Sequence, residues 1–263
     1  MAKVIVFVHG AGKQGPNYAV DPLAEVALRL GYEPLAVPVY YADIANVGSP
    51  PGVIAFSFGD EPPLVAEPPA VQQFKMQFAM QVQATMGAQP PMDQVTTLSI
   101  SPTFIGELVA TEANEIAGYL FNPDVYNRIQ ARMCDGLDKA AQQGDTLVIA
   151  SHSLGTLVAF DALKAVGDRY KISTFMTMGS PLAIIRRLGL RGPELGAITS
   201  KNVGEWLNFY NPPDPVSNVV GPYFPIPGYR PRDVYVTVAS LPPASHDYLR
   251  NAECLQAIAD AVK

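Results

Sequence analysis

One short stretch near the middle of the chain constrains its fold more than any other. Residues 146–150 are apolar or β-branched and predict a buried strand, while residues 154–166 repeat apolar side chains at helical spacing. A strand that passes so directly into a helix needs small residues around the turn, because the two backbones approach each other closely there. Ser151 and Gly155, two positions on either side of Ser153, meet this need. Ser153 is therefore predicted to stand on a tight strand-to-helix turn.

A serine held on such a turn is a candidate nucleophile. The usual pattern is G-x-S-x-G, and this chain has Ser151 at its first position, which is small but carries a Cβ. The free N–H of Leu154, at the start of the helix, can face a developing oxyanion. The same S-x-S-x-G pattern also occurs in ordinary Ser/Gly turns, so the turn alone leaves a purely structural role open.

A second signal lies at the start of the chain. Residues 4–8 predict a buried strand that runs into the sequence His9-Gly10-Ala11-Gly12. A glycine-flanked loop of this kind can present backbone N–H groups to a ligand, although it also serves as a plain strand-to-helix connection.

A strand that ends in His-Gly, followed much later by a serine elbow, resembles the α/β-hydrolase superfamily, among its esterase- and lipase-like members. The resemblance implies a three-layer α/β-hydrolase fold with a mainly parallel sheet of about six strands. It also implies an oxyanion hole formed by the N–H groups of Ala11 and Leu154. It spans nearly the whole chain except residues 42–122, and the leading antiparallel strands of larger members have no counterpart here.

The serine needs a base, and the chain has only three histidines. His9 lies in the glycine loop, and the side chain of His152, next to Ser153, should leave the turn in another direction. His246 follows the last predicted strand, where loops at the carboxyl edge of a parallel sheet meet. We therefore expect His246 to be the base.

The base in turn needs a carboxylate, and three aspartates lie nearby in the sequence. Asp233 begins the final strand and so belongs to the wrong end of the sheet, and Asp247 adjoins the histidine too closely to reach its ring. Asp214 follows a strand at the correct edge. The order Ser153, Asp214, His246 is that of the α/β-hydrolases, which implies a catalytic triad.

Residues 1–263 are expected to form a single domain with an insertion at about residues 42–122. Prolines dominate the first part of the insertion and predict an extended loop, whereas residues 71–86 and 103–120 favour helices. These helices would form a lid or cap with Met and Phe side chains facing an apolar substrate, or would simply cover extra core. Elsewhere we expect a helix capped by Asp21 and ended by Gly31, a helix capped by Asn122, a surface segment over residues 183–203, strands at 35–40, 172–178, 206–210 and 234–238, and a final helix at 253–262.

Composition narrows the function classes. The net charge of −6 and the lack of a basic stripe argue against a nucleic-acid partner. Cys134 and Cys254 are scattered, so free thiols are favoured, and neither a structural metal nor a cofactor is expected. No signal peptide or membrane span is visible, which predicts a cytoplasmic location without stable membrane insertion.

The predicted activity is hydrolysis of a carboxylic ester on a small-molecule or lipid-like substrate. Thioesterase, amidase or acyltransferase chemistry on the same triad stays open, as does a binding protein that has kept the fold without activity. The Met- and Phe-rich insertion also permits a lipase that makes transient contact with a lipid interface.

Overall fold

A computed structural model of the chain describes residues 2–12, 14–48, 67–87, 102–189, 203–224, 231–239 and 244–263. Its centre is a single six-stranded sheet with the order β2-β1-β3-β4-β5-β6, in which every neighbouring pair is parallel. The strands are β1 (Lys3–Val8), β2 (Leu35–Val39), β3 (Thr146–His152), β4 (Ile172–Met178), β5 (Val203–Tyr210) and β6 (Arg232–Tyr235). The expectation of about six parallel strands is confirmed.

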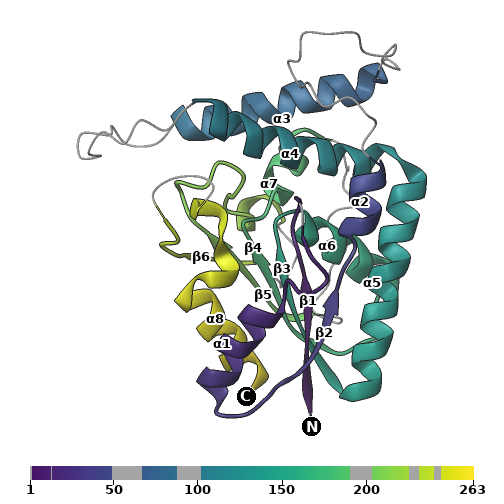
Figure 1. Cartoon of the computed structure of the whole chain (residues 1–263), viewed down its shortest axis with the longest axis vertical. Helices are drawn as coiled ribbons and strands as arrows, with labels where there is room; N and C mark the ends of the chain where they lie inside the picture. The colour runs from purple at the N-terminus through teal and green to yellow at the C-terminus, as the bar shows by residue number, and fades with distance from the viewer. Residues whose placement is uncertain are drawn as a thin grey trace.

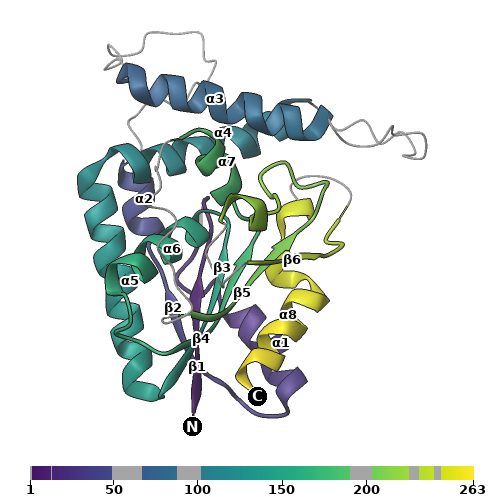
Figure 2. The same cartoon turned by 180° about the vertical axis from the view of Figure 1, so that it is seen from behind.

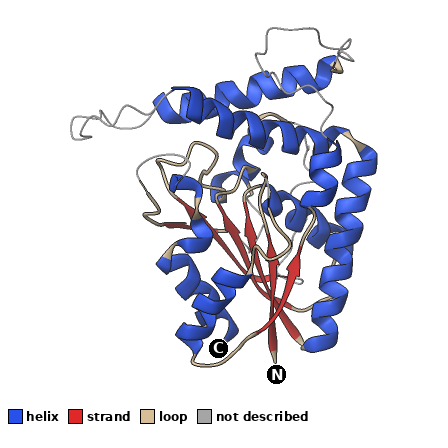
Figure 3. Cartoon of the chain, viewed as in Figure 1, coloured by secondary structure: helices blue, strands red, loops and turns tan. Residues whose placement is uncertain are grey.

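Helices cover both faces of the sheet, as Figures 1 and 2 show from opposite sides. The helices α1 (Val20–Leu30) and α8 (Ala252–Val262) pack on one face, while α5 (Pro123–Gln143) and α6 (Leu154–Val166) pack on the other. Both faces of the central strands are thus buried, which explains their almost unbroken apolar sequences. The result is the layered α/β arrangement seen in Figure 3.

The segment between β2 and β3 contributes a further set of helices, α2 (Ala42–Gly48), α3 (Pro69–Gly87) and α4 (Pro102–Phe121). Helices α3 and α4 lie across the end of the sheet toward which the strands run (Figure 1). The two helices expected in the insertion are confirmed, and α2 was not predicted. Most of the proline-rich loop, residues 49–66, lies outside the described residues.

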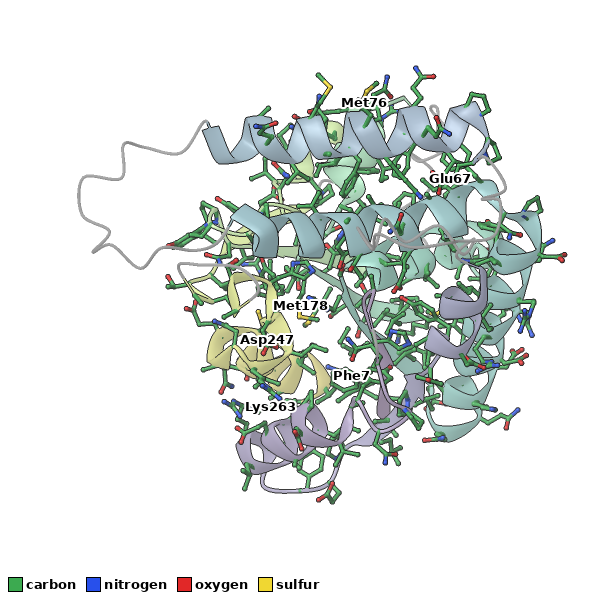
Figure 4. All side chains as sticks on the ribbon, turned by 45° about the horizontal axis from the view of Figure 1, so that its top comes forward. Phe7, Glu67, Met76, Met178, Asp247 and Lys263 are labelled. Atoms are coloured by element: carbon green, nitrogen blue, oxygen red, sulfur yellow. The ribbon has the colours of Figure 1, made fainter. Side chains whose placement is uncertain are left out.

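The two faces of α3 have different surroundings. Phe74, Phe78 and Val82 recur at helical spacing and are buried in the core cluster that includes α4. Met76 and Met80 point away from the protein and are 59% and 60% exposed, and Figure 4 shows Met76 on the outer side of the helix. These methionines do not face the site, so α3 mainly extends the core.

Local signals fixed several helix ends. Asn122 caps α5 by accepting hydrogen bonds from the N–H groups of Asp124 and Val125, and Gly31 ends α1 in the left-handed conformation at φ 76°. The prediction for Asp21 was wrong, because Ala19 is the N-cap of α1 and Asp21 lies in the first turn.

The predicted surface segment at 183–203 also needs correction. Residues 182–185 are buried in α7 (Leu182–Arg187), and residues 190–202 lie outside the described part. Strand β6 is shorter and earlier than predicted. In the described ranges, short 3₁₀ helices lie in the segments that follow β5 and β6: η2 (Gly221–Tyr223), η3 (Ala244–His246) and η4 (Tyr248–Arg250).

Two other expectations concern the chain as a whole. In the part of the chain that the structure describes, no helix is both long and apolar enough to cross a membrane. Cys134 and Cys254 are both free thiols; Cys254 is buried, and Cys134 is partly exposed.

Candidate active site

Ser153 occupies the single residue between β3 and α6. Its backbone has φ 48° and ψ −125°, and among the described residues it is the one non-glycine residue with positive φ. Such a conformation is strained for a residue with a Cβ and persists only where its surroundings enforce it. The Ser153 N–H donates to the Met178 carbonyl at 2.9 Å, which ties the turn to β4. The predicted tight turn is confirmed.

The glycines around this turn are required by close approach. A Cβ at Gly155 would press against the carbonyl oxygens of Val8 and His9, and a Cβ at Gly10 would lie 2.6 Å from the Cβ of Ser153. The loop after β1 therefore packs directly on the serine turn. Ser151, which replaces the usual glycine, is buried and donates its hydroxyl to the Met176 carbonyl at 2.7 Å.

The predicted acid and base lie in contact. His246 Nδ1 is 2.7 Å from Asp214 Oδ2, and both side chains are buried. Asp214 Oδ1 accepts the N–H of Val216 at 3.0 Å, so both carboxylate oxygens are used. Because a carboxylate only accepts, His246 must carry its proton on Nδ1 here, which leaves Nε2 to face the site.

The other aspartates do not compete for this role. Asp247 is 45% exposed at its side chain and faces Arg250 at 3.7 Å. Asp233 binds the side chain of Asn208 and the N–H groups of Val220 and Gly221, and so fastens the loop between β5 and β6.

The other two histidines help to build the site. The His152 side chain is directed to His246: its Nε2 lies 2.8 Å from the His246 carbonyl oxygen, and the two rings are 4.6 Å apart. Burial lowers the pKa of His152 to about 3, so the neutral ring donates to that carbonyl and holds the backbone of His246. Asn211 adds a second tether by donating to the Ser245 carbonyl at 2.9 Å.

His9 holds the glycine loop. Its Nδ1 donates to the Gly10 carbonyl at 2.6 Å, its Nε2 accepts the N–H of Tyr41 at 3.0 Å, and its ring stacks on the Tyr41 ring. Burial lowers the pKa of His9 to about 4. A neutral ring fits these contacts, because one nitrogen donates while the other accepts.

Two carboxylates of α4 reach the site and were missed by the sequence analysis. Glu112 Oε1 accepts the hydroxyl of Ser153 at 2.7 Å and lies 3.5 Å from His246 Nε2. Glu115 Oε1 accepts the N–H of Gly12 at 2.8 Å. The spacing of three residues places both acids on one face of α4, but no pattern in the sequence indicated where that face would lie.

Burial and the neighbouring carboxylates have opposite effects on the pKa of His246. Burial alone would lower its pKa, but the adjacent Asp214 carboxylate and then Glu112 outweigh burial and raise the pKa to about 10. The hydroxyl proton of Ser153 is directed to Glu112. The serine is not hydrogen-bonded to its expected base in this state.

One predicted oxyanion donor belongs to the serine turn itself, and the other belongs to the loop that packs on this turn. Leu154 is the first residue of α6, where backbone N–H groups have no partner within the helix. Ala11 belongs to the loop that packs on the turn and precedes the N–H bound by Glu115. Within the described ranges, no group of three or more His, Cys, Asp or Glu residues is arranged to hold a metal ion.

A scan against protein-family models and a search of the curated proteins both find no match for this chain.

Proposed function

We propose that this protein is a serine hydrolase of the α/β-hydrolase type that cleaves carboxylic esters through an acyl-enzyme. The observation that carries the proposal is the strained Ser153 turn, with φ 48°, beside a buried His246–Asp214 pair joined at 2.7 Å. A structural serine has no need of a strained backbone, and a structural histidine has no need of a buried carboxylate behind it.

In this mechanism neutral His246 accepts the hydroxyl proton of Ser153 as its Oγ attacks the ester carbonyl carbon. The N–H groups of Leu154 and Ala11 stabilise the oxyanion that forms. The C–O bond to the alcohol then breaks, and His246 returns the proton to the leaving alkoxide. Water, deprotonated by the same histidine, attacks the acyl-enzyme and releases the carboxylic acid and Ser153.

Asp214 orients the imidazole and stabilises its charged form during both steps. His152 fixes the backbone of His246, so that the ring meets the serine from a defined direction. The hydroxyl of Ser153 must rotate from Glu112 to His246 before the reaction begins, because its proton now faces the carboxylate.

The test is hydrolysis of p-nitrophenyl esters of increasing acyl length by the wild type and by Ser153→Ala. Loss of the nucleophile should lower kcat by about a million-fold. A fluorophosphonate probe should label Ser153 in the wild type and leave the variant unlabelled. Equal turnover by the two proteins would refute the proposal, and so would a folded wild type that neither hydrolyses esters nor reacts with the probe.

A further inference from the structure

The carboxylate of Glu112 lies directly beside the Ser153 hydroxyl, where the acyl group of a substrate has to bind. It is 2% exposed and contacts both the nucleophile and the base. An acyl carbonyl carbon has to come within about 3–3.5 Å of Ser153 Oγ, so part of the substrate must lie against this carboxylate. Glu112 is thus a substrate-facing group if the proposed function holds.

Glu112 is also incompletely satisfied. Its Oε2 is buried and has no hydrogen-bond partner among the described residues, and His246 Nε2 also has none. A buried carboxylate oxygen without a donor costs free energy comparable to a lost charge-assisted hydrogen bond. The free oxygen therefore calls for a donor that is absent from the chain described here.

The negative charge of the site also favours a positively charged ligand. Glu112 and Asp214 both lie against His246, and Glu115 lies near Glu112 on the same helix. No Lys or Arg of the described residues forms an ion pair with any of these three carboxyl groups. Burial, and next the nearby Glu112, raises the pKa of Glu115 to about 7, although the Gly12 N–H opposes this change. Among the described residues, His246 is the basic side chain that lies against both Glu112 and Asp214.

We propose that Glu112 binds a protonated amine of the substrate, and that the substrates are esters whose acyl group carries an ammonium within two or three bonds of the reacting carbonyl. This proposal rests on the proposed hydrolase function. The short distance between Ser153 Oγ and Glu112 Oε1, 2.7 Å, is what limits the ammonium to the immediate neighbourhood of the carbonyl. A primary ammonium supplies both the charge and the N–H donor that Oε2 lacks.

Binding of the ammonium also prepares the base. In the free protein Glu112 helps to hold His246 in its charged form. A cation on Glu112 offsets that negative charge and repels the imidazolium, so His246 loses its proton more readily. Asp214 on one side and His152 on the other keep the ring in place meanwhile. The Ser153 hydroxyl, displaced from Glu112 by the ammonium, is free to turn to the neutral Nε2.

The experiment compares alanine ethyl ester with ethyl isobutyrate, in which a methyl group replaces the ammonium. The wild type, Glu112→Gln and the surface control Glu253→Gln on α8 are assayed for kcat/KM at a pH below about 7, where an α-amino group is protonated. Comparison of the same two esters across variants cancels the difference in their intrinsic reactivity. Thermal unfolding of each variant verifies that it is folded.

We expect Glu112→Gln to lower the charged-to-neutral ratio of kcat/KM by about 10- to 100-fold, the effect of losing one charge-assisted hydrogen bond. Glu253→Gln should leave the ratio unchanged. An unchanged ratio in Glu112→Gln would overturn the proposal. Equal acceleration of both esters would overturn it too, because Glu112 would then be only an obstruction above the serine.

A binding measurement separates this proposal from the hydrolase function. In calorimetry, Ser153→Ala should bind alanine ethyl ester with a lower Kd than ethyl isobutyrate. The double variant Ser153→Ala/Glu112→Gln should show no such difference in Kd. If the preference for the charged ester is present but no ester is turned over by the wild type, the hydrolase function fails and the amine site stands. If neutral esters are hydrolysed without any charge preference, the amine site alone fails.

Discussion

Replacement of Asp214 by Asn tests the core of the proposed site with little change in shape. The Asp214 carboxylate is fully buried, accepts from His246 Nδ1 at 2.7 Å and also accepts the Val216 N–H at 3.0 Å. An asparagine can keep the bond to Val216 through its oxygen, and it then presents its NH₂ group to His246. That group is a donor, so Nδ1 must become an acceptor and the proton must move to Nε2.

The expected kinetic effect follows from that tautomer. A ring protonated on Nε2 cannot take the Ser153 proton, and loss of the correct tautomer in a serine triad lowers kcat by about 10⁴-fold. At about 1.36 kcal/mol for each factor of ten, this corresponds to about 5.4 kcal/mol of lost transition-state stabilisation. The effect should fall on kcat and leave KM almost unchanged, because Asp214 is buried behind the ring and does not face the substrate.

The same substitution makes an independent spectroscopic prediction. Asp214 is the main group that raises the pKa of His246 to about 10 against the opposing effect of burial. Without it, burial should dominate and the pKa should drop far below that value. With only three histidines in the chain, an NMR titration of the imidazole protons can follow this change directly.

The control is Asp247→Asn, which removes the exposed acid next to His246 in the sequence. Its kcat for p-nitrophenyl butyrate should stay within about twofold of the wild type, as is usual for surface substitutions. An Asp214→Asn protein that is folded and retains kcat within tenfold would refute the reasoning. A His246 pKa that stays near 10 in that variant would refute the charge assignment.

Three further predictions concern stability. Gly155→Ala should cost about 1–3 kcal/mol, because its Cβ meets backbone carbonyls, whereas Gly15→Ala, which meets nothing, should be nearly neutral in the same urea titration. Phe78→Ala should cost about 3–5 kcal/mol and exposed Met76→Ala less than about 0.5 kcal/mol, measured by thermal unfolding; similar losses would contradict the described orientation of α3. The pKa of the Glu115 carboxyl is raised from 4.5 to about 7 in the folded protein, so the wild type should lose stability as pH rises from about 4.5 to 7. Over this range the free energy of unfolding of Glu115→Gln should therefore increase relative to that of the wild type. A difference between the two proteins that does not change with pH would contradict this effect of the Glu115 carboxyl.

Sequence patterns predicted the parts of the structure that depend on neighbouring residues. The turn at Ser153, the cap at Asn122 and strand β4 were all predictable, because close approach, side-chain capping and apolar runs leave a local signature. The proximity of Asp214 and His246 could also be expected, since both follow strands at the carboxyl edge of the same sheet. Asp214 was selected because Asp233 begins a strand and Asp247 adjoins the histidine, and the chain order of the resembled family agreed with this choice.

Contacts that depend on long-range packing could not be predicted from the sequence. Glu112 lies on a largely apolar helix, and only the position of α4 above the sheet brings it to Ser153. The direction of His152 likewise depends on where η3 places the His246 carbonyl. The helical spacing of Phe74, Phe78 and Val82 marks the buried side of α3, but it does not tell which element this side packs against.

The pairing of β1 with β3 affects how quickly the chain can fold. Lys3 lies opposite Thr146, so the two central strands meet across roughly 140 residues of intervening chain. The entropy of closing such a long loop must be overcome before the pairing yields any stabilisation, and parallel sheets of this kind form slowly. Until β3 docks, the apolar strand β1 has only β2 beside it, and its other edge is open to association with other chains. Refolding yield should therefore fall steeply with protein concentration, and the centre of the sheet should be among the last parts of the molecule to assemble.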